Sequence, residues 1–173
     1  IDLSQKIFLT EIKPEGEIID LGCGTGEKTI WFHKQGLKVV AVDASPQMLE
    51  KLNNCKNIKI QKVDLSKIEF PKKYDGMWAS FSIQHLGKNI QDLLFKKISK
   101  ALNNNGILYI GIHEGYKIYR DNLNRLYVPR SENEIRKVFK KNDLMIFNFF
   151  KEKNLSFDNE PIKVMHIFAK LKI

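Results

Sequence analysis

The 173-residue sequence predicts a single α/β domain, residues 1–173, built on an open sheet of seven mostly parallel strands with helices on both faces. Three observations predict it. Short apolar runs alternate with helical patterns, which is typical of parallel β/α units. The length and a hydrophobic content of 43% suit one sizeable core. The last two apolar runs are joined by a short loop, which predicts a C-terminal antiparallel hairpin.

The elements follow in order along the chain. The first helix is stopped by "KPEG", the second is closed by Gly36 as a C-cap glycine, and the third has Ser45 as its N-cap with Pro46 in its first turn. A helix after the fourth strand ends at "NNNG", and Ser131 caps the last one, which contains Ile135 and Val138. The predicted strands span residues 17–20, 38–43, 57–64, 74–81, 107–113, 144–151 and 162–172. The first four predicted helices span residues 2–12, 27–36, 45–54 and 90–102.

One predicted helix has a clear apolar stripe, whose members are separated by three, one, four, three and one positions. This spacing predicts that the stripe faces the sheet. Its members are Ile90, Leu93, Leu94, Ile98, Ala101 and Leu102.

Charge and cysteine content narrow the functional classes. Lysine and arginine outnumber aspartate and glutamate by 29 to 20, giving +9, but the lysines are scattered, which is typical of a solvated surface; a nucleic-acid partner stays open. Two cysteines are too few for a disulfide framework or a cysteine-based zinc site, so no metal is predicted. With no recognisable signal peptide and no apolar run near the ~20 residues that span a bilayer, we expect a cytoplasmic protein without a membrane partner.

The stretch "DLGCGTG" places three glycines, Gly22, Gly24 and Gly26, directly after the first strand. Glycine tolerates positive φ and lacks a Cβ, so the turn can be tight and its amides can lie against a ligand. In an open α/β sheet, ligands bind at the carboxyl ends of the strands. Three acidic residues end three successive strands there: Asp20, Asp43 and Asp64. Asp43 is placed to accept hydrogen bonds from two vicinal ribose hydroxyls.

The glycine spacing disfavours NAD, because Glu27 stands where the third glycine of the dinucleotide fingerprint would fall. "DLGCGTG" resembles the first motif of the class I S-adenosylmethionine-dependent methyltransferases. "VVAVDASPQML", "VDL" and "YDGMWASFSIQHL" are similar to later motifs of that family, and "LNNNGILYIGI" to the turn and strand that follow. This resemblance implies a Rossmann-like fold, S-adenosyl-L-methionine as cofactor and S-adenosyl-L-homocysteine as product.

The resemblance also implies a set of cofactor contacts. The glycine turn would approach the methionyl group, Asp43 the ribose, and Asp64 the exocyclic amine of the adenine. The cofactor-binding residues predicted in this way are Asp20, Gly22, Cys23, Gly24, Thr25, Gly26, Asp43, Ala44, Met48, Asp64, Leu65, Ser80, Phe81 and His85. Methyl transfer from an activated sulfonium needs chiefly alignment of the acceptor and exclusion of water.

Candidates for catalysis and acceptor binding come from two further places. A general base is needed only if the acceptor is protonated near neutral pH, and His85 and His113 are the candidates. Residues 113–130 carry tyrosines and arginines that could form an acceptor wall, with Tyr116 and Arg125 as the predicted substrate contacts. The sequence favours a methyltransferase acting on a small molecule by in-line displacement. The alternatives are an RNA methyltransferase and a non-catalytic module that binds a nucleotide or a partner on the same fold.

Overall fold

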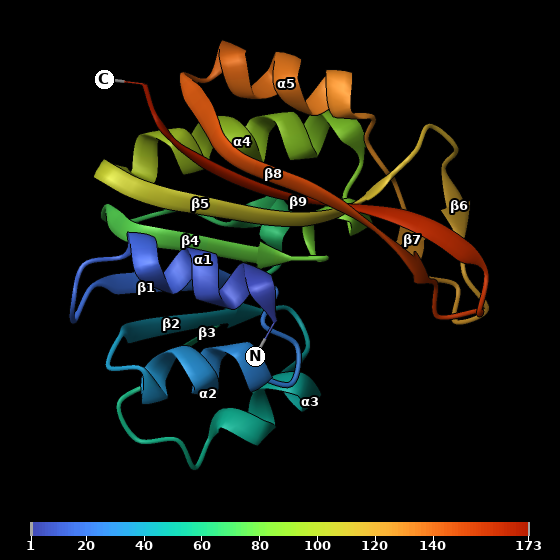
Figure 1. Cartoon of the computed structure of the whole chain (residues 1–173). Coiled ribbons are helices and arrows are strands. Elements are labelled where there is room, and N and C mark those ends of the chain that lie inside the picture. The colour runs from blue at the N-terminus through green and yellow to red at the C-terminus, as the bar shows by residue number, and fades with distance from the viewer. Residues whose placement is uncertain (1, 173) are drawn as a thin grey trace.

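The computed structural model describes residues 2–172, and it confirms the predicted α/β fold (Figure 1). Seven strands form one sheet in the order β3-β2-β1-β4-β5-β9-β8, in which β9 runs antiparallel to both β5 and β8. The strands are β1 (Glu17–Leu21), β2 (Lys38–Asp43), β3 (Lys59–Lys62), β4 (Tyr74–Ser80), β5 (Leu102–Glu114), β8 (Leu144–Leu155) and β9 (Pro161–Leu171), with a separate hairpin of β6 (Tyr119–Arg120) and β7 (Leu126–Tyr127). The helices are α1 (Leu3–Glu11), α2 (Glu27–Lys34), α3 (Pro46–Leu49), α4 (Lys88–Ala101) and α5 (Glu132–Lys141), with short 3-10 turns η1 (Glu50–Leu52), η2 (Leu65–Lys67) and η3 (Ile83–His85).

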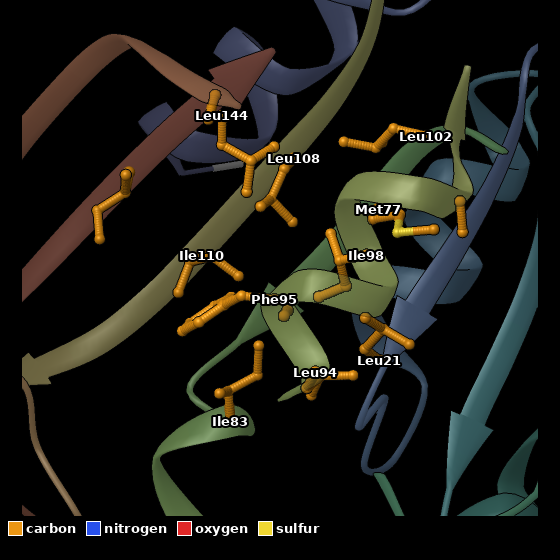
Figure 2. Close-up of a cluster of buried hydrophobic side chains, with 14 of the residues drawn as sticks. Leu21, Met77, Ile83, Leu94, Phe95, Ile98, Leu102, Leu108, Ile110 and Leu144 are labelled. Carbon is orange, nitrogen blue, oxygen red and sulfur yellow. The ribbon is translucent and has the colours of Figure 1, made fainter. Parts of the chain in front are cut away.

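Helices cover both faces of the sheet, as the continuously apolar strands require. Helices α4 and α5 pack on one face over a core that includes Phe95, Ile98 and Phe139. Figure 2 shows Phe95 and Ile98 of α4 among the side chains of this core. On the other face, α1 and α2 contribute Phe8 and Phe32, whose rings meet Trp78 of β4 at about 5 Å between centroids. The two cores fix the sheet from both sides, so the loops at the carboxyl ends of its strands project from a rigid base.

The N-caps were predicted well because their signals are local. The Ser45 hydroxyl accepts a hydrogen bond from the Met48 amide, and Ser131 forms a capping box with Glu134. The predicted helix 45–54 was wrong in part, since α3 ends at Leu49 and continues only as the 3-10 turn η1. The third strand is shorter than predicted, and Asp64 lies beyond it as the cap of η2.

The apolar stripe predicted on the helix after β4 was wrong at two positions. Ile90 and Leu93 are exposed, by 38% and 59%, whereas Gln91 and Phe95 are fully buried. The helix is therefore rotated relative to the prediction, and a polar side chain takes a place in the buried row with Leu94 and Ile98. The hairpin β6–β7 was not predicted either, because its strands are only two residues long.

Candidate functional site

The glycine turn after β1 is held against the end of β2. The amides of Gly22 and Cys23 both donate to the carbonyl oxygen of Val42, at 2.8 Å each. Gly22 and Gly24 have φ angles of 76° and 54°, which favour glycine. A Cβ on Gly22 would lie 2.4 Å from Ser82 Cβ, whereas a Cβ on Gly24 would point into open space. Gly22 therefore allows the loop after β4 to lie close to the turn, and Gly24 leaves space beside the backbone for a ligand.

Asp43, at the end of β2, joins this turn to the start of α3. Its Oδ2 accepts a hydrogen bond from the Gly24 amide at 2.9 Å, and its Oδ1 accepts one from the Ser45 amide at 2.9 Å. A carboxylate has about four lone-pair sites, so each oxygen keeps capacity for a further donor. Asp43 thus orders two loops and still has acceptor sites for a ligand's hydroxyl groups.

A cavity of about 480 Å³ opens at this edge of the sheet, within the roughly 300–1,000 Å³ typical of small-molecule sites. It collects ten of the predicted cofactor residues from the ends of β1, β2, β3 and β4. These are Gly22, Gly24, Asp43, Ala44, Met48, Asp64, Leu65, Ser80, Phe81 and His85. Ser45, Ser82 and Leu86 complete the wall together with Arg125. Sequence reasoning missed those first three, although each directly adjoins a residue that it named.

Four of the predicted cofactor residues, Asp20, Cys23, Thr25 and Gly26, do not line the cavity. Asp20 lies beneath the turn, where its carboxylate accepts a hydrogen bond of 2.6 Å from the Thr29 hydroxyl and so joins β1 to α2. Burial raises the pKa of the Cys23 thiol to about 12, so the thiol is not a nucleophile near neutral pH. These positions support the turn, and any direct contact with a cofactor stays a prediction.

Phe81, just after β4, has a φ of 56°, which is unusual for a bulky residue. Its amide donates to the Gly111 carbonyl at 2.8 Å. A Cβ on Gly111 would come within 3.3 Å of the Phe81 ring and 2.9 Å of the Tyr109 hydroxyl oxygen. The glycine therefore makes room for a strained residue that lines the cavity, and such strain is often found at functional sites.

His85 lies in the wall with a fixed orientation. Its Nδ1 is 2.6 Å from the carbonyl oxygen of Leu126, and the edge of its ring meets the Tyr127 ring at 4.6 Å between centroids. A carbonyl only accepts hydrogen bonds, so Nδ1 carries the proton in the neutral imidazole. Nε2 then keeps its lone pair and is the atom that can accept a proton.

His113, the second predicted base, does not line the cavity. Its ring stacks on Tyr127, and its Nδ1 is 3.0 Å from the Tyr119 hydroxyl. Burial, with the nearby His85 as a smaller cause, lowers the pKa of His113 to about 4. His113 is therefore neutral at pH 7 and packs behind the wall that contains His85.

The two predicted substrate residues lie in different places. Arg125 lines the cavity, where its Nε and Nη2 both donate to the buried carboxylate of Asp121 at 2.6 Å. Its guanidinium lies over the Phe157 ring at 4.7 Å. Tyr116 is 78% exposed and lines a separate hollow with Glu114, so the structure does not bring it to the cavity.

A family model for the methyltransferase domain matches residues 18–106, slightly more than half of the chain. The chain belongs to the methyltransferase-domain family. The resemblance to S-adenosylmethionine-dependent methyltransferases that the sequence motifs indicated is therefore confirmed. S-adenosylmethionine is the cofactor of this class, which confirms the predicted cofactor as well. The family match ends at Gly106, before residues 113–130, which carry Arg125.

Known proteins with similar sequences or folds agree with this assignment. The methyltransferase domain is 33% identical over 107 residues to a Helicobacter pylori (strain Shi470) carboxy-S-adenosyl-L-methionine synthase, covering 58% of this chain and 44% of that protein. It is 29% identical over 96 residues to an uncharacterized methyltransferase of Staphylococcus carnosus (strain TM300), covering 56% of this chain and 46% of that protein. The chain thus spans less than half the length of these relatives.

Among solved structures, the fold matches the Burkholderia thailandensis 1,6-didemethyltoxoflavin-N1-methyltransferase. The TM-score is 0.81 at 17% identity, and the match covers 98% of this chain and 77% of that one. At this level of identity the likeness shows the fold alone. Within residues 2–172, the methyltransferase domain has no helix that is both long and apolar enough to cross a bilayer. The same residues hold no cluster of three or more side chains suited to bind a metal ion.

The buried Asp20 gives the methyltransferase domain a measurable pH dependence. Burial raises its pKa from 3.8 to about 7, although the Thr29 hydrogen bond opposes the shift. The folded state therefore holds this proton more tightly than the unfolded state, and stability is lost as the pH rises from about 4 through 7. By linkage the contribution is at most roughly 4 kcal/mol. We expect Asp20→Asn to remove this dependence of the free energy of unfolding on pH.

Chemical unfolding of both proteins at pH 5 and pH 8 measures the effect. The low pKa of His113 acts in the opposite direction below pH 6.5, but it is present in both proteins and cancels in the difference. Equal pH dependence in the two proteins would show that Asp20 ionises normally in the folded state.

Proposed function

We propose that this domain transfers a methyl group from S-adenosylmethionine to a small-molecule acceptor by in-line displacement. The observation that carries the proposal is one cavity whose wall contains Asp43 and Gly24 together with His85 and Arg125. When bound, the cofactor supplies an already activated methyl group. The protein's own residues then need to align the acceptor, exclude water and remove a proton where the acceptor carries one.

The residues of the cavity fit this cofactor. Asp43 keeps lone pairs for the two ribose hydroxyls, and Gly24 leaves open space where the methionyl group would lie. The carboxylates of Asp43 and Asp64 in the wall favour a ligand with positive charge. Met48 and Leu65 supply apolar surface for the adenine.

His85 is proposed as the general base and Arg125 as an acceptor contact. The Leu126 carbonyl fixes the proton on Nδ1 of His85, so Nε2 can take a proton from an acceptor N–H or O–H. Arg125 uses two of its five donors on Asp121, which holds the guanidinium still and leaves three donors for a ligand. A small acceptor also suits the structural neighbour, whose structure contains 1,6-didemethyltoxoflavin and S-adenosylhomocysteine.

Two experiments test the proposal in sequence. By calorimetry and thermal unfolding, S-adenosylhomocysteine should bind and stabilise the protein by ~2.7 kcal/mol at a hundredfold excess over its Kd, while NAD should do neither. A screen for S-adenosylhomocysteine release across a metabolite library and bulk tRNA then identifies the acceptor. Release only with tRNA, weakened steeply by salt, would favour RNA as the acceptor. No release with any acceptor would favour the non-catalytic module.

Arg125→Ala is expected to lower turnover at least ~10-fold, or ~1.4 kcal/mol in transition-state stabilisation. The reason is that Arg125 is the cationic residue in the wall of the cavity. Tyr116→Ala is the matched variant, because Tyr116 belongs to the same segment but lies outside the cavity, and its effect should be smaller. Steady-state kinetics of both variants, with S-adenosylhomocysteine affinity measured alongside, provide the comparison. Unchanged kinetics for Arg125→Ala would place acceptor recognition elsewhere.

A further inference from the structure

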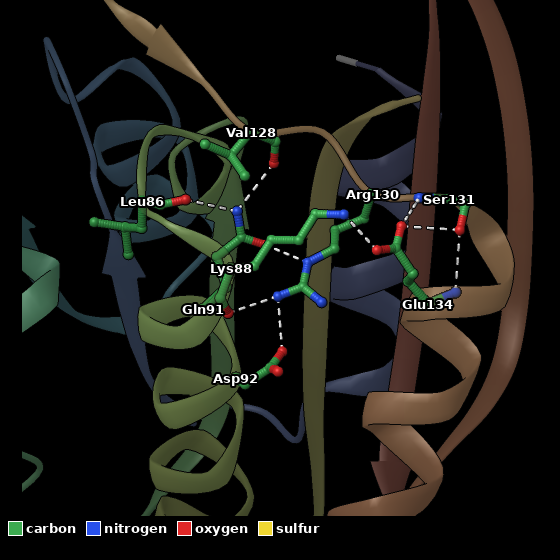
Figure 3. Close-up of polar contacts among 8 residues, drawn as sticks. All are labelled: Leu86, Lys88, Gln91, Asp92, Val128, Arg130, Ser131 and Glu134. Atoms are coloured by element: carbon green, nitrogen blue, oxygen red, sulfur yellow. Dashed lines mark hydrogen bonds and ion pairs between the residues drawn. The ribbon is translucent and has the colours of Figure 1, made fainter. Parts of the chain in front are cut away.

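Gln91 occupies a position on α4 where an apolar residue would be expected. Its side chain is fully buried in the same row as Leu94, Phe95 and Ile98. Burying an amide in such a row costs free energy unless its hydrogen bonds are made. All of its bonding groups are used here, which indicates a specific role for this amide (Figure 3).

The Gln91 amide joins two segments that border the cavity. Its Nε2 donates to the carbonyl oxygen of Leu86 at 2.8 Å and to that of Val128 at 3.0 Å. Leu86 lines the cavity next to His85, and Val128 follows the hairpin β6–β7. One side chain therefore ties the loop after β4 to the end of the segment that forms the acceptor wall.

Arg130 fixes which way the amide faces. Its Nε donates to Gln91 Oε1 at 2.8 Å, so Nε2 must be the atom that faces the two carbonyls (Figure 3). The guanidinium is itself held by the Lys88 carbonyl and the Asp92 carboxylate, each at 2.7 Å from Nη2. Arg130 is buried, with 4% exposure, and these three side-chain contacts all go to residues of α4.

Two further hydrogen bonds connect this set of contacts to His85. The Val128 amide donates to the Gln84 carbonyl at 2.7 Å, and the Leu126 carbonyl faces His85 Nδ1 at 2.6 Å. Gln91, on α4, contacts the same two segments through the carbonyl oxygens of Leu86 and Val128. If residues 126–128 shift away, Nδ1–H loses its acceptor, and the ring is free to carry its proton on either nitrogen.

We propose that Gln91 is a positioning residue for methyl transfer, which holds residues 126–128 against the β4 loop and thereby keeps the lone pair of His85 on Nε2. The inference rests on the proposed function, in which Nε2 of His85 accepts the acceptor's proton. The tautomer of His85 can nevertheless be observed without any acceptor, so it is tested separately from catalysis.

Two substitutions separate positioning from simple packing. Gln91→Met keeps the volume but removes every hydrogen bond. Gln91→Glu keeps an acceptor for Arg130 but has no amide donor for the Leu86 and Val128 carbonyls. Asp92→Asn is the control, because Asp92 is a partner of Arg130 that is 51% exposed and touches neither carbonyl.

The decisive measurement is the imidazole ¹⁵N spectrum of the full chain at pH 8, with the His85 signals assigned from His85→Gln. The wild type and Asp92→Asn should show His85 protonated on Nδ1, whereas both Gln91 variants should show a mixture of tautomers. Once the acceptor is identified, both Gln91 variants should lose at least ~10-fold in turnover, with S-adenosylhomocysteine affinity within about twofold of wild type.

Three results would overturn the inference. The first is a wild-type spectrum with the His85 proton on Nε2, which overturns the inference without the need for any folded variant. A folded Gln91→Glu that keeps the wild-type tautomer shows that the amide donors do not act through His85. A mixture of tautomers in Asp92→Asn equal to that of the Gln91 variants shows a general loosening of α4. A chain that binds S-adenosylhomocysteine but methylates nothing contradicts the proposed function instead, and the tautomer result stands apart from it.

Discussion

Replacing His85 by glutamine is expected to lower turnover by roughly 10²–10⁴-fold, the usual effect of losing a positioned general base. Glutamine can still donate a hydrogen bond toward the Leu126 carbonyl, but it cannot take a proton from the acceptor. A loss is expected because Nδ1 is engaged at 2.6 Å by the Leu126 carbonyl, which leaves Nε2 as the proton acceptor. S-adenosylhomocysteine affinity should change much less, because Asp43 and the glycine turn are untouched.

The pH profile of turnover distinguishes the loss of a general base from a change in the shape of the cavity. A general base makes kcat fall at acidic pH, so an acidic limb in the wild type that is absent from the residual activity of His85→Gln would identify the loss of the base. His33→Gln is the matched control, since His33 lies on α2 and does not line the cavity. A variant that retains wild-type turnover would show that the acceptor needs no base or finds one elsewhere.

Asp43→Ala is expected to weaken S-adenosylhomocysteine binding by roughly 1.5–3 kcal/mol, the range for hydrogen bonds to a charged group. The carboxylate has two tasks, since it accepts the Gly24 and Ser45 amides and also keeps lone pairs for the ribose. Asp43→Asn should lie between wild type and alanine, because it keeps one acceptor oxygen. Calorimetric titration measures the affinities, and Glu50→Ala, on the neighbouring turn η1, provides a charge-matched control.

Thermal unfolding of the Asp43 variants shows whether the effect is local. The domain should still fold, because none of the buried hydrophobic clusters described for residues 2–172 includes Asp43. Binding as tight as in the wild type would mean that the ribose lies elsewhere in the cavity.

The part of the cavity that we propose for the cofactor could be located from the sequence because its signals are local. A glycine turn after a strand, and an acidic residue at the end of the next strand, specify their own position at the carboxyl edge of a parallel sheet. Gly22, Gly24 and Asp43 therefore lie in the cavity as expected. Asp20 and Gly26 belong to the same motif, but they do not line the cavity. The spacing of the motif does not distinguish residues that line the cavity from residues that support the turn.

The part of the cavity that we propose for the acceptor was harder to predict because tertiary contacts define it. Gln91 was overlooked because a polar residue between Ile90 and Leu93 is most simply interpreted as exposed, and the true buried row is offset by one position. One signal was available: Gln91 stands three and four positions before Leu94 and Phe95, in register with the buried side. The carbonyls that it binds carry no sequence signal at all.

The way Gln91 holds residues 126–128 has a consequence for how acceptor preference can diverge among related proteins. The amide recognises backbone carbonyl oxygens, which every amino acid provides. The hydrogen bond from Gln91 therefore does not depend on which side chains the hairpin β6–β7 carries, provided that Arg130 and the length of the connection are kept. On the proposed function, the main chain anchors this segment and the side chain of Arg125 contacts the acceptor, so other acceptors can be tried by substitution at Arg125.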